Sequence, residues 1–89
     1  MSFKKYLWKC RLLVLNTPNY SHPEYKRSKD LYQKEIKGFH KRYIKLVTKL
    51  DKSKKFKVTL IGFDGTIKIE LDKIYTKKIF EIFDKMPMN

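Results

Sequence analysis

The stretch that decides the fold of this chain is Phe56-Lys57-Val58-Thr59-Leu60-Ile61-Gly62-Phe63-Asp64-Gly65-Thr66-Ile67-Lys68. Its Asp64-Gly65 pair separates two apolar runs, and glycine tolerates the positive φ that a tight turn needs. The stretch therefore predicts a β-hairpin, with strands over residues 56–62 and 66–71. In the second strand isoleucine and leucine alternate with Lys68 and Glu70, which is typical of a strand at the edge of a sheet.

The residues before the hairpin predict a strand, a helix and another strand. Residues 12–15 are a continuous apolar run, which predicts a strand buried on both faces. A helix follows, with Ser21 as N-cap, Pro23 in the first turn and Glu24 as the capping-box partner, and we expect it to end at Gly38. Residues 43–50 predict the second strand, and residues 51–55 are a short polar connector.

The residues after the hairpin predict a last helix, from Asp72 to Pro87. The element order is then β-α-β-β-β-α, in which the strand–helix–strand unit is parallel and right-handed. A sheet of order 2-1-3-4 places the two continuously apolar strands in the centre. Five residues easily cross the one neighbouring strand that lies between strands two and three, a step of about 10 Å.

These elements predict an α/β fold of the thioredoxin-like type. We expect a four-stranded mixed sheet with two helices on one face. Compared with a thioredoxin, this expected fold lacks the middle helix. Residues 1–9 are interpreted as an N-terminal arm, and residues 10–89 as one minimal thioredoxin-like domain, because 89 residues suffice for a single core.

The composition is strongly basic. Twenty-two Lys and Arg against nine Asp and Glu give a net charge of 22 − 9 = +13, which attracts nucleic acid, anionic membranes or acidic proteins. Nineteen of the 22 are Lys, and the chain contains no Ala. An AT-rich genome accounts for this composition better than selection for nucleic-acid binding, because phosphate sites more often use Arg.

Cysteine and histidine are scarce. Cys10 is the one cysteine, so an intrachain disulfide and a cysteine-based zinc site are excluded. His22 and His40 lie too far apart in sequence to change that, and we expect neither a metal nor a cofactor. Nothing in the sequence reads as a signal peptide or reaches transmembrane length, so we expect a soluble intracellular protein with no membrane span.

Five segments carry a resemblance to a known family. They are Trp8-Lys-Cys-Arg-Leu-Leu-Val-Leu15, Thr17-Pro-Asn19, Gly38-Phe-His-Lys-Arg42, Phe56-x-Val-x-Leu-Ile-Gly62-x-Asp-Gly65-x-x-Lys68 and Phe83-Asp-Lys-Met-Pro-Met88. The chain resembles the small thioredoxin/peroxiredoxin-like domain of unknown function found in bacterial proteins and in animal matrix proteins of the sushi-repeat-containing and Urb/Equarin type. Phe63 stands where that family usually has Lys. The resemblance implies a fold and little chemistry.

A thioredoxin-type redox site needs a reactive cysteine after the first strand, at the N-terminus of the helix. This chain has Asn16-Thr-Pro-Asn-Tyr-Ser21 there, and Cys10 lies before the strand. We therefore predict that the protein is not an enzyme. A degenerate one-Cys redox protein that uses Cys10 is an alternative.

The missing middle helix leaves one sheet face without a helix. By alternation this face carries either Leu12 and Val14 or Leu13 and Leu15. The partner-binding candidates on it are Lys45, Val47, Lys49, Lys57, Thr59, Ile61 and Lys68, beside Glu70.

The mixture of apolar and basic residues on this face favours a protein partner. An acidic protein or a second copy of the chain is the expected occupant, and the N-terminal arm is a third candidate. Nucleic acid is the alternative, because open sheets with basic and aromatic residues bind single strands. We therefore predict a non-catalytic binding or assembly module.

Overall fold

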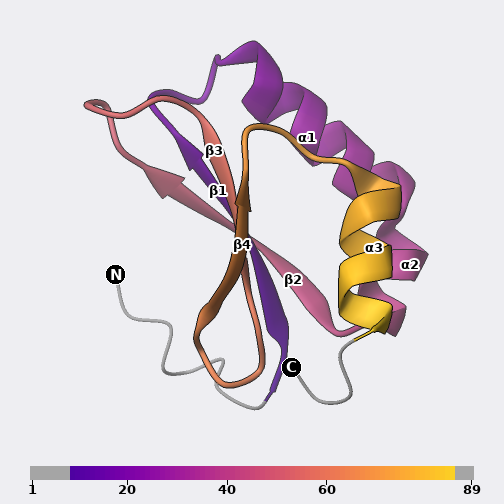
Figure 1. The fold of residues 1–89 in the computed structure, drawn as a ribbon. Coiled ribbons are helices and arrows are strands. Elements are labelled where there is room, and N and C mark those ends of the chain that lie inside the picture. Colours follow the sequence, from indigo (N-terminus) through magenta and orange to yellow (C-terminus); the bar gives the residue numbers. More distant parts are fainter. Residues whose placement is uncertain (1–8, 86–89) are drawn as a thin grey trace.

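The computed structural model describes residues 9–85, which form seven elements of secondary structure (Figure 1). In chain order they are β1 (Arg11–Thr17), α1 (Pro23–Lys34), α2 (Ile36–Lys41), β2 (Ile44–Leu50), β3 (Lys57–Ile61), β4 (Ile67–Leu71) and α3 (Thr76–Asp84).

The four strands form one mixed sheet of order β2-β1-β3-β4. β1 pairs parallel with β2 and antiparallel with β3, and β3 pairs antiparallel with β4. The predicted sheet order and fold class are therefore confirmed. β1 is central and its apolar run is buried on both faces: Leu12 and Leu13 are 1% and 0% exposed. The predicted turn is also present, with Gly65 at φ 81°.

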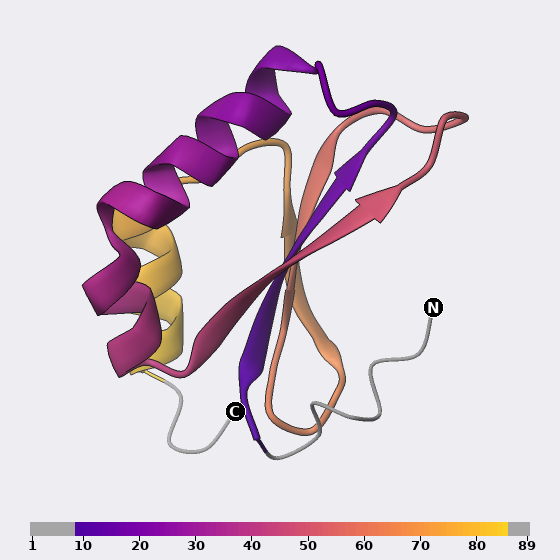
Figure 2. The ribbon, with the colours of Figure 1, turned by 180° about the vertical axis from the view of Figure 1, so that it is seen from behind.

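All the described helices lie on one side of the sheet (Figure 2). The main core lies between them and the sheet, and its fully buried side chains include Phe39, Phe83, Leu13, Leu15 and Leu60. Leu13 and Leu15 thus face the helices, so Leu12 and Val14 face the other way, where they form a second cluster with Ile61.

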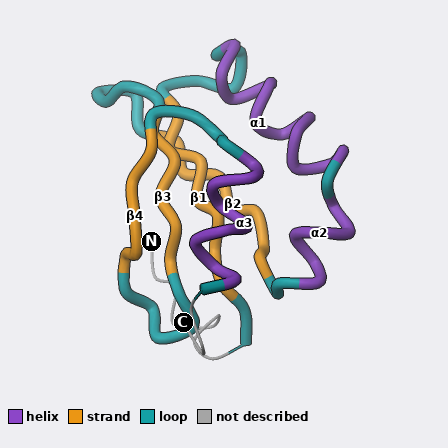
Figure 3. Tube along the Cα trace, turned by 45° about the vertical axis from the view of Figure 1, so that its right-hand side comes forward, coloured by secondary structure: helices purple, strands orange, loops and turns teal. Residues whose placement is uncertain are grey.

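The first helix differs from the prediction at both ends. Its N-cap is His22, whose Nδ1 accepts from the Glu24 backbone N–H at 3.2 Å, so Ser21 is not the cap. The helix does not end at Gly38, because the chain leaves helical geometry at Glu35 (φ −107°, ψ 27°) and resumes it as α2. Two helices were expected and three are present (Figure 3).

Gly38 therefore lies within α2, where it serves packing. A Cβ atom at this position would lie 2.8 Å from the Phe80 ring of α3. The absence of a side chain lets the two helices approach closely. In the sequence alone, a glycine that permits such a contact cannot be told from a glycine that ends a helix.

The last helix begins at Thr76, four residues later than predicted. The preceding residues 72–75 form a loop, and its Ile74 is buried in the core at 1% exposure. The predicted end at Pro87 lies outside the described residues, and so does the N-terminal arm up to residue 8.

Candidate partner-binding face

Leu12, Val14 and Ile61 form the apolar centre of the sheet face that bears no described helix. Val14 pairs with Val47 on one side and with Thr59 on the other. Although no described helix covers this centre, its three side chains are only 1%, 2% and 4% exposed. Cys10 and Val47 pack against them. Residues 1–8, the arm proposed to cover this face, lie outside the described part of the chain.

A hollow of about 510 Å³ lies on this face, toward the connector between β2 and β3. Its described lining residues come from all four strands and from the connector. They are Val14, Asn16, Lys49, Asp51, Lys54, Lys55, Lys57, Thr59, Ile61, Ile67 and Glu70. The floor is apolar and the rim carries lysines, so the hollow combines the two properties that we predicted for the face.

Ile67 enters the hollow because of a β-bulge. Leu60 pairs with Ile69, but Ile61 pairs with Ile67, so Lys68 is an extra residue in β4. An extra residue reverses the side-chain alternation beyond it. The sequence predicted that Ile67 shares a face with Ile69 and Leu71, and this is wrong: Ile67 is 60% exposed and lines the hollow beside Ile61.

The connector of residues 51–55 forms a hydrogen-bonded wall at one end of the hollow. Asp51 Oδ1 accepts from the Ser53 backbone N–H at 3.1 Å and from its hydroxyl at 2.7 Å. The Lys54 N–H donates to the Asp51 carbonyl at 3.2 Å. These bonds hold the turn that presents Lys54 and Lys55, which the sequence analysis left out of the candidate site.

The floor also contains a fixed polar pair. Asn16 Nδ2 donates to Thr59 Oγ1 at 3.0 Å and to the Lys57 carbonyl at 3.3 Å. The Lys57 ammonium in turn lies 3.8 Å from a Glu70 carboxylate oxygen on the neighbouring strand. Charged residues at the rim are thus partly paired within the face.

The hollow collects only some of the predicted site residues. Lys49, Lys57, Thr59 and Ile61 line it, and Val47 packs beside it against the apolar centre. Lys45 lines a different hollow. Lys68 donates to Asp64 Oδ2 at 3.1 Å within the hairpin and does not line either hollow.

Cys10 and Lys45 line a second hollow, of about 300 Å³, at the start of β1. Burial raises the pKa of its thiol, against an opposing effect of the charges on Lys45 and Lys9. Reactive cysteines usually have a lowered pKa. The loop that would hold a thioredoxin-type cysteine lies beyond the opposite end of β1, at residues 18–22.

The side chains around that loop are engaged in local structure. Asn19 Oδ1 accepts from the Ser21 N–H at 3.0 Å, and the Thr17 hydroxyl donates to the Asn19 carbonyl at 2.6 Å. His22 caps α1 and stacks on the Phe56 ring, with centroids 5.5 Å apart.

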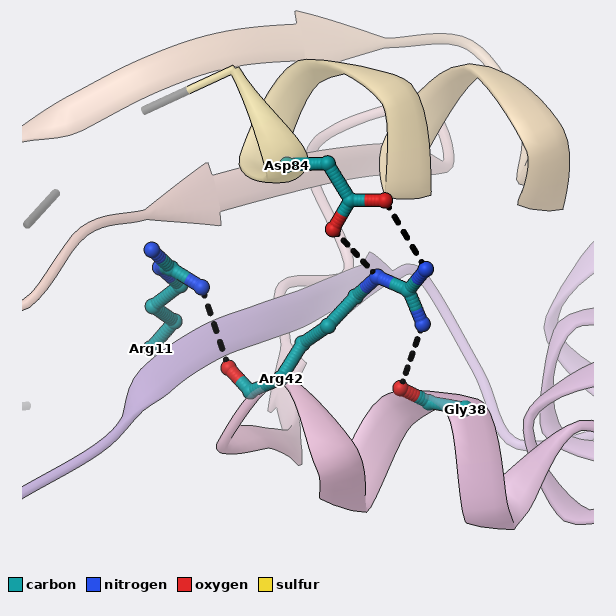
Figure 4. Close-up of polar contacts among 4 residues, drawn as sticks. All are labelled: Arg11, Gly38, Arg42 and Asp84. Atoms are coloured by element: carbon teal, nitrogen blue, oxygen red, sulfur yellow. Dashed lines mark hydrogen bonds and ion pairs between the residues drawn. The ribbon is translucent and has the colours of Figure 1, made fainter. Parts of the chain in front are cut away.

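Two arginines form a cluster at the Cys10 end of β1 (Figure 4). Arg42 binds both carboxylate oxygens of Asp84, at 2.8 and 2.9 Å, and donates to the Gly38 carbonyl at 3.0 Å. Arg11 is 7% exposed, lies between the Phe63 and Phe83 rings at 4.8 and 4.9 Å, and donates to the Arg42 carbonyl.

The cluster joins three elements and therefore has a structural role. Nothing in the local sequence around Asp84 indicates this partner, because Arg42 lies 42 residues away in the chain. Among residues 9–85, no group of three or more His, Cys, Asp or Glu side chains is placed to hold a metal ion. None of the described helices has the length and apolar character to cross a membrane.

Comparison with known proteins identifies the fold. No protein-family model and no curated protein matches the sequence. Among solved structures, the chain is similar to the reduced 2-Cys peroxiredoxin of Plasmodium vivax, with 14% sequence identity and a TM-score of 0.73. The alignment covers 94% of this chain and 81% of that one. At this identity the likeness shows the fold alone, and the chain has a thioredoxin-like fold.

Proposed function

We propose that this protein is a non-catalytic binding or assembly module whose partner surface is the sheet face without helices. The observation that carries the proposal is the lysine-rimmed hollow on that face, with Ile67 exposed at its floor. An apolar concave surface with convergent polar groups is the usual form of a binding site. We further propose kinship with the thioredoxin/peroxiredoxin-like domain of unknown function, on the five segments given above.

Two observations support a non-catalytic role. The β1–α1 loop contains no cysteine, and its side chains cap and brace the helix start. Cys10 lies at the opposite end of β1 and burial raises its pKa. We also propose an intracellular setting, because a single cysteine gives no intrachain disulfide.

The test is an NMR titration of the isotope-labelled full chain. Backbone amide signals of Lys55, Thr59 and Ile67 are followed in three series: increasing protein concentration, an acidic leucine-containing peptide, and single-stranded oligothymidine. We expect the protein-concentration series or the peptide series to shift these signals more than those of Lys77 and Lys78 on α3.

Two results would overturn the proposal. One is the absence of a response to all three probes, whether or not residues 1–8 contact Val14 or Thr59. The other is a peroxide-reducing activity that disappears in Cys10→Ser, which would establish the one-Cys redox alternative. A response to oligothymidine alone, falling steeply with added salt, would establish the nucleic-acid alternative.

A further inference from the structure

We propose that the occupant of the lysine-rimmed hollow is an acidic segment of another protein that carries an aliphatic anchor residue. This inference rests on the proposed function and names the partner chemistry of the same face.

The charge at the rim selects an acidic ligand. Four lysines that line the hollow are exposed: Lys49, Lys54, Lys55 and Lys57. Among the described lining residues the acidic ones are Asp51 and Glu70, so this described lining carries a net charge of 4 − 2 = +2. Asp51 is held by its bonds to Ser53, and Glu70 faces Lys57. Lys54 and Lys55 stand on the connector turn, where they are positioned to contact carboxylates of a bound segment.

The floor selects an aliphatic anchor. Val14, Ile61 and Ile67 line it; Val14 and Ile61 are buried, whereas Ile67 is 60% exposed in the free protein. An inserted leucine or isoleucine side chain would remove that surface from water. The Asn16 amide and the Thr59 hydroxyl in the floor already hydrogen-bond to each other, so an apolar anchor does not leave them without a partner.

A second copy of the chain fits this hollow poorly. A symmetric dimer through this face would place the same lysines opposite one another, and like charges across an interface oppose association. The sequence has nine acidic residues, no two of them adjacent. Its nearest approach to an acidic segment with an aliphatic residue is Glu70-Leu71-Asp72, and Leu71 packs against the helix-side core.

Nucleic acid fits it poorly as well. None of the described lining residues is aromatic and none is Arg. Single-stranded nucleic acid sites combine a basic groove with aromatic platforms for the bases. The exposed tyrosines of the described residues do not line the hollow; they are Tyr20, Tyr43 and Tyr75.

The inference is tested by fluorescence anisotropy with three labelled peptides of equal length. In the first, leucines are flanked by glutamates; in the second, serine replaces each leucine; in the third, lysine replaces each glutamate. We expect the first peptide to bind, the second to bind about tenfold or more weakly because the anchor is lost, and the third not to bind.

Matched variants locate the site. Lys54→Glu with Lys55→Glu should weaken binding of the first peptide by about tenfold or more. Lys77→Glu with Lys78→Glu makes the same change in net charge on an adjacent, exposed pair of α3, on the opposite side of the sheet. This control should change the affinity by less than about threefold, because salt screens distant charges. Ile67→Ser, at an exposed position, should weaken the leucine peptide selectively.

The outcomes separate the two proposals. If the face responds to protein concentration but not to the leucine–glutamate peptide, the acidic-segment inference is wrong and the binding module remains. A response to oligothymidine alone overturns both in favour of the nucleic-acid alternative. Equal losses in the two double variants would mean nonspecific attraction to the +13 chain and would also overturn the inference. If no probe affects the face, both proposals fail.

Discussion

Arg42 and Asp84 join the end of α2 to the end of α3 through two parallel hydrogen bonds, from Nε at 2.8 Å and from Nη2 at 2.9 Å. The arginine is also held from two other sides: its guanidinium lies 4.0 Å from the Phe80 ring centroid, and it donates to the Gly38 carbonyl. This arrangement makes Arg42 the shared contact of two helices.

The first prediction concerns how much melting temperature is lost when each side of this contact is changed. Arg42→Ala should lower the melting temperature most, by roughly 4–8 °C, because it removes the ion pair, the ring contact and the bond to Gly38 together. Arg42→Lys should lie between Arg42→Ala and the wild type, because an ammonium group cannot form the planar two-bond contact. Asp84→Asn should cost least, because Asp84 is largely exposed. A larger loss for Asp84→Asn than for Arg42→Ala would contradict this account.

The second prediction concerns the hairpin at low pH. The pKa of Asp64 is lowered from 3.8 to about 2, chiefly by the Thr66 N–H at 3.0 Å, then by its hydroxyl at 2.8 Å and by Lys68. Because the folded pKa is depressed, the stabilisation is fully present above the unfolded value near 3.8 and is lost as pH falls through about 2. A pH titration that follows the NMR signal of the Asp64 carboxyl carbon should have its midpoint at a pH of about 2.

A variant of the same turn provides the control. Thr66→Val removes the hydroxyl donor and keeps the backbone donor, so the Asp64 pKa should rise and still remain below 3.8. The difference in melting temperature between the wild type and Asp64→Asn should be constant from neutral pH down to about 4 and shrink below it. A wild-type midpoint at the ordinary value would show that the turn does not bind the carboxylate in solution.

The third prediction concerns Gly38 and Phe80. Gly38→Ala improves helix propensity by about 1 kcal/mol but places a methyl group 2.8 Å from the Phe80 ring. Phe80 is held by the Phe39 ring at 4.8 Å and by Arg42, so overpacking of about 1–3 kcal/mol should prevail and the variant should be less stable. Urea unfolding measures the difference.

The sign should reverse when the ring is removed. In a Phe80→Ala background, the same Gly38→Ala change should stabilise the protein, because only the propensity term remains. If alanine at position 38 is stabilising in both backgrounds, the close approach of α2 and α3 does not limit this site.

The fourth prediction concerns a buried hydroxyl. Ser28 on α1 is 0% exposed, and its Oγ has no hydrogen-bond partner in the described structure. Ser28→Ala should therefore stabilise the protein by about 1 kcal/mol, through lower desolvation cost and better helix propensity. Thr17→Val is the matched opposite case: that hydroxyl is buried and donates to the Asn19 carbonyl, so its removal should destabilise. Thermal unfolding measures both variants. Changes in melting temperature of the same sign for Ser28→Ala and Thr17→Val would contradict the prediction.

The sequence by itself determined the strands, their order and the hairpin. Apolar continuity at residues 12–15, the Asp64-Gly65 turn and a five-residue connector are local features, and a short connector permits few sheet arrangements. It also determined that basic and apolar residues would share the helix-free face, since alternation along a strand fixes which side chains lie together.

Tertiary structure decided the features that depend on a distant residue. Gly38 resembles a helix stop until Phe80 packs against it. Ile67 follows simple alternation until pairing with β3 inserts Lys68 as an extra residue and turns Ile67 into the hollow. Asp84 gains a partner only when α3 folds beside α2. In each case the cause is a contact between segments far apart in the chain, and a local sequence pattern carries no record of which distant side chain it will meet.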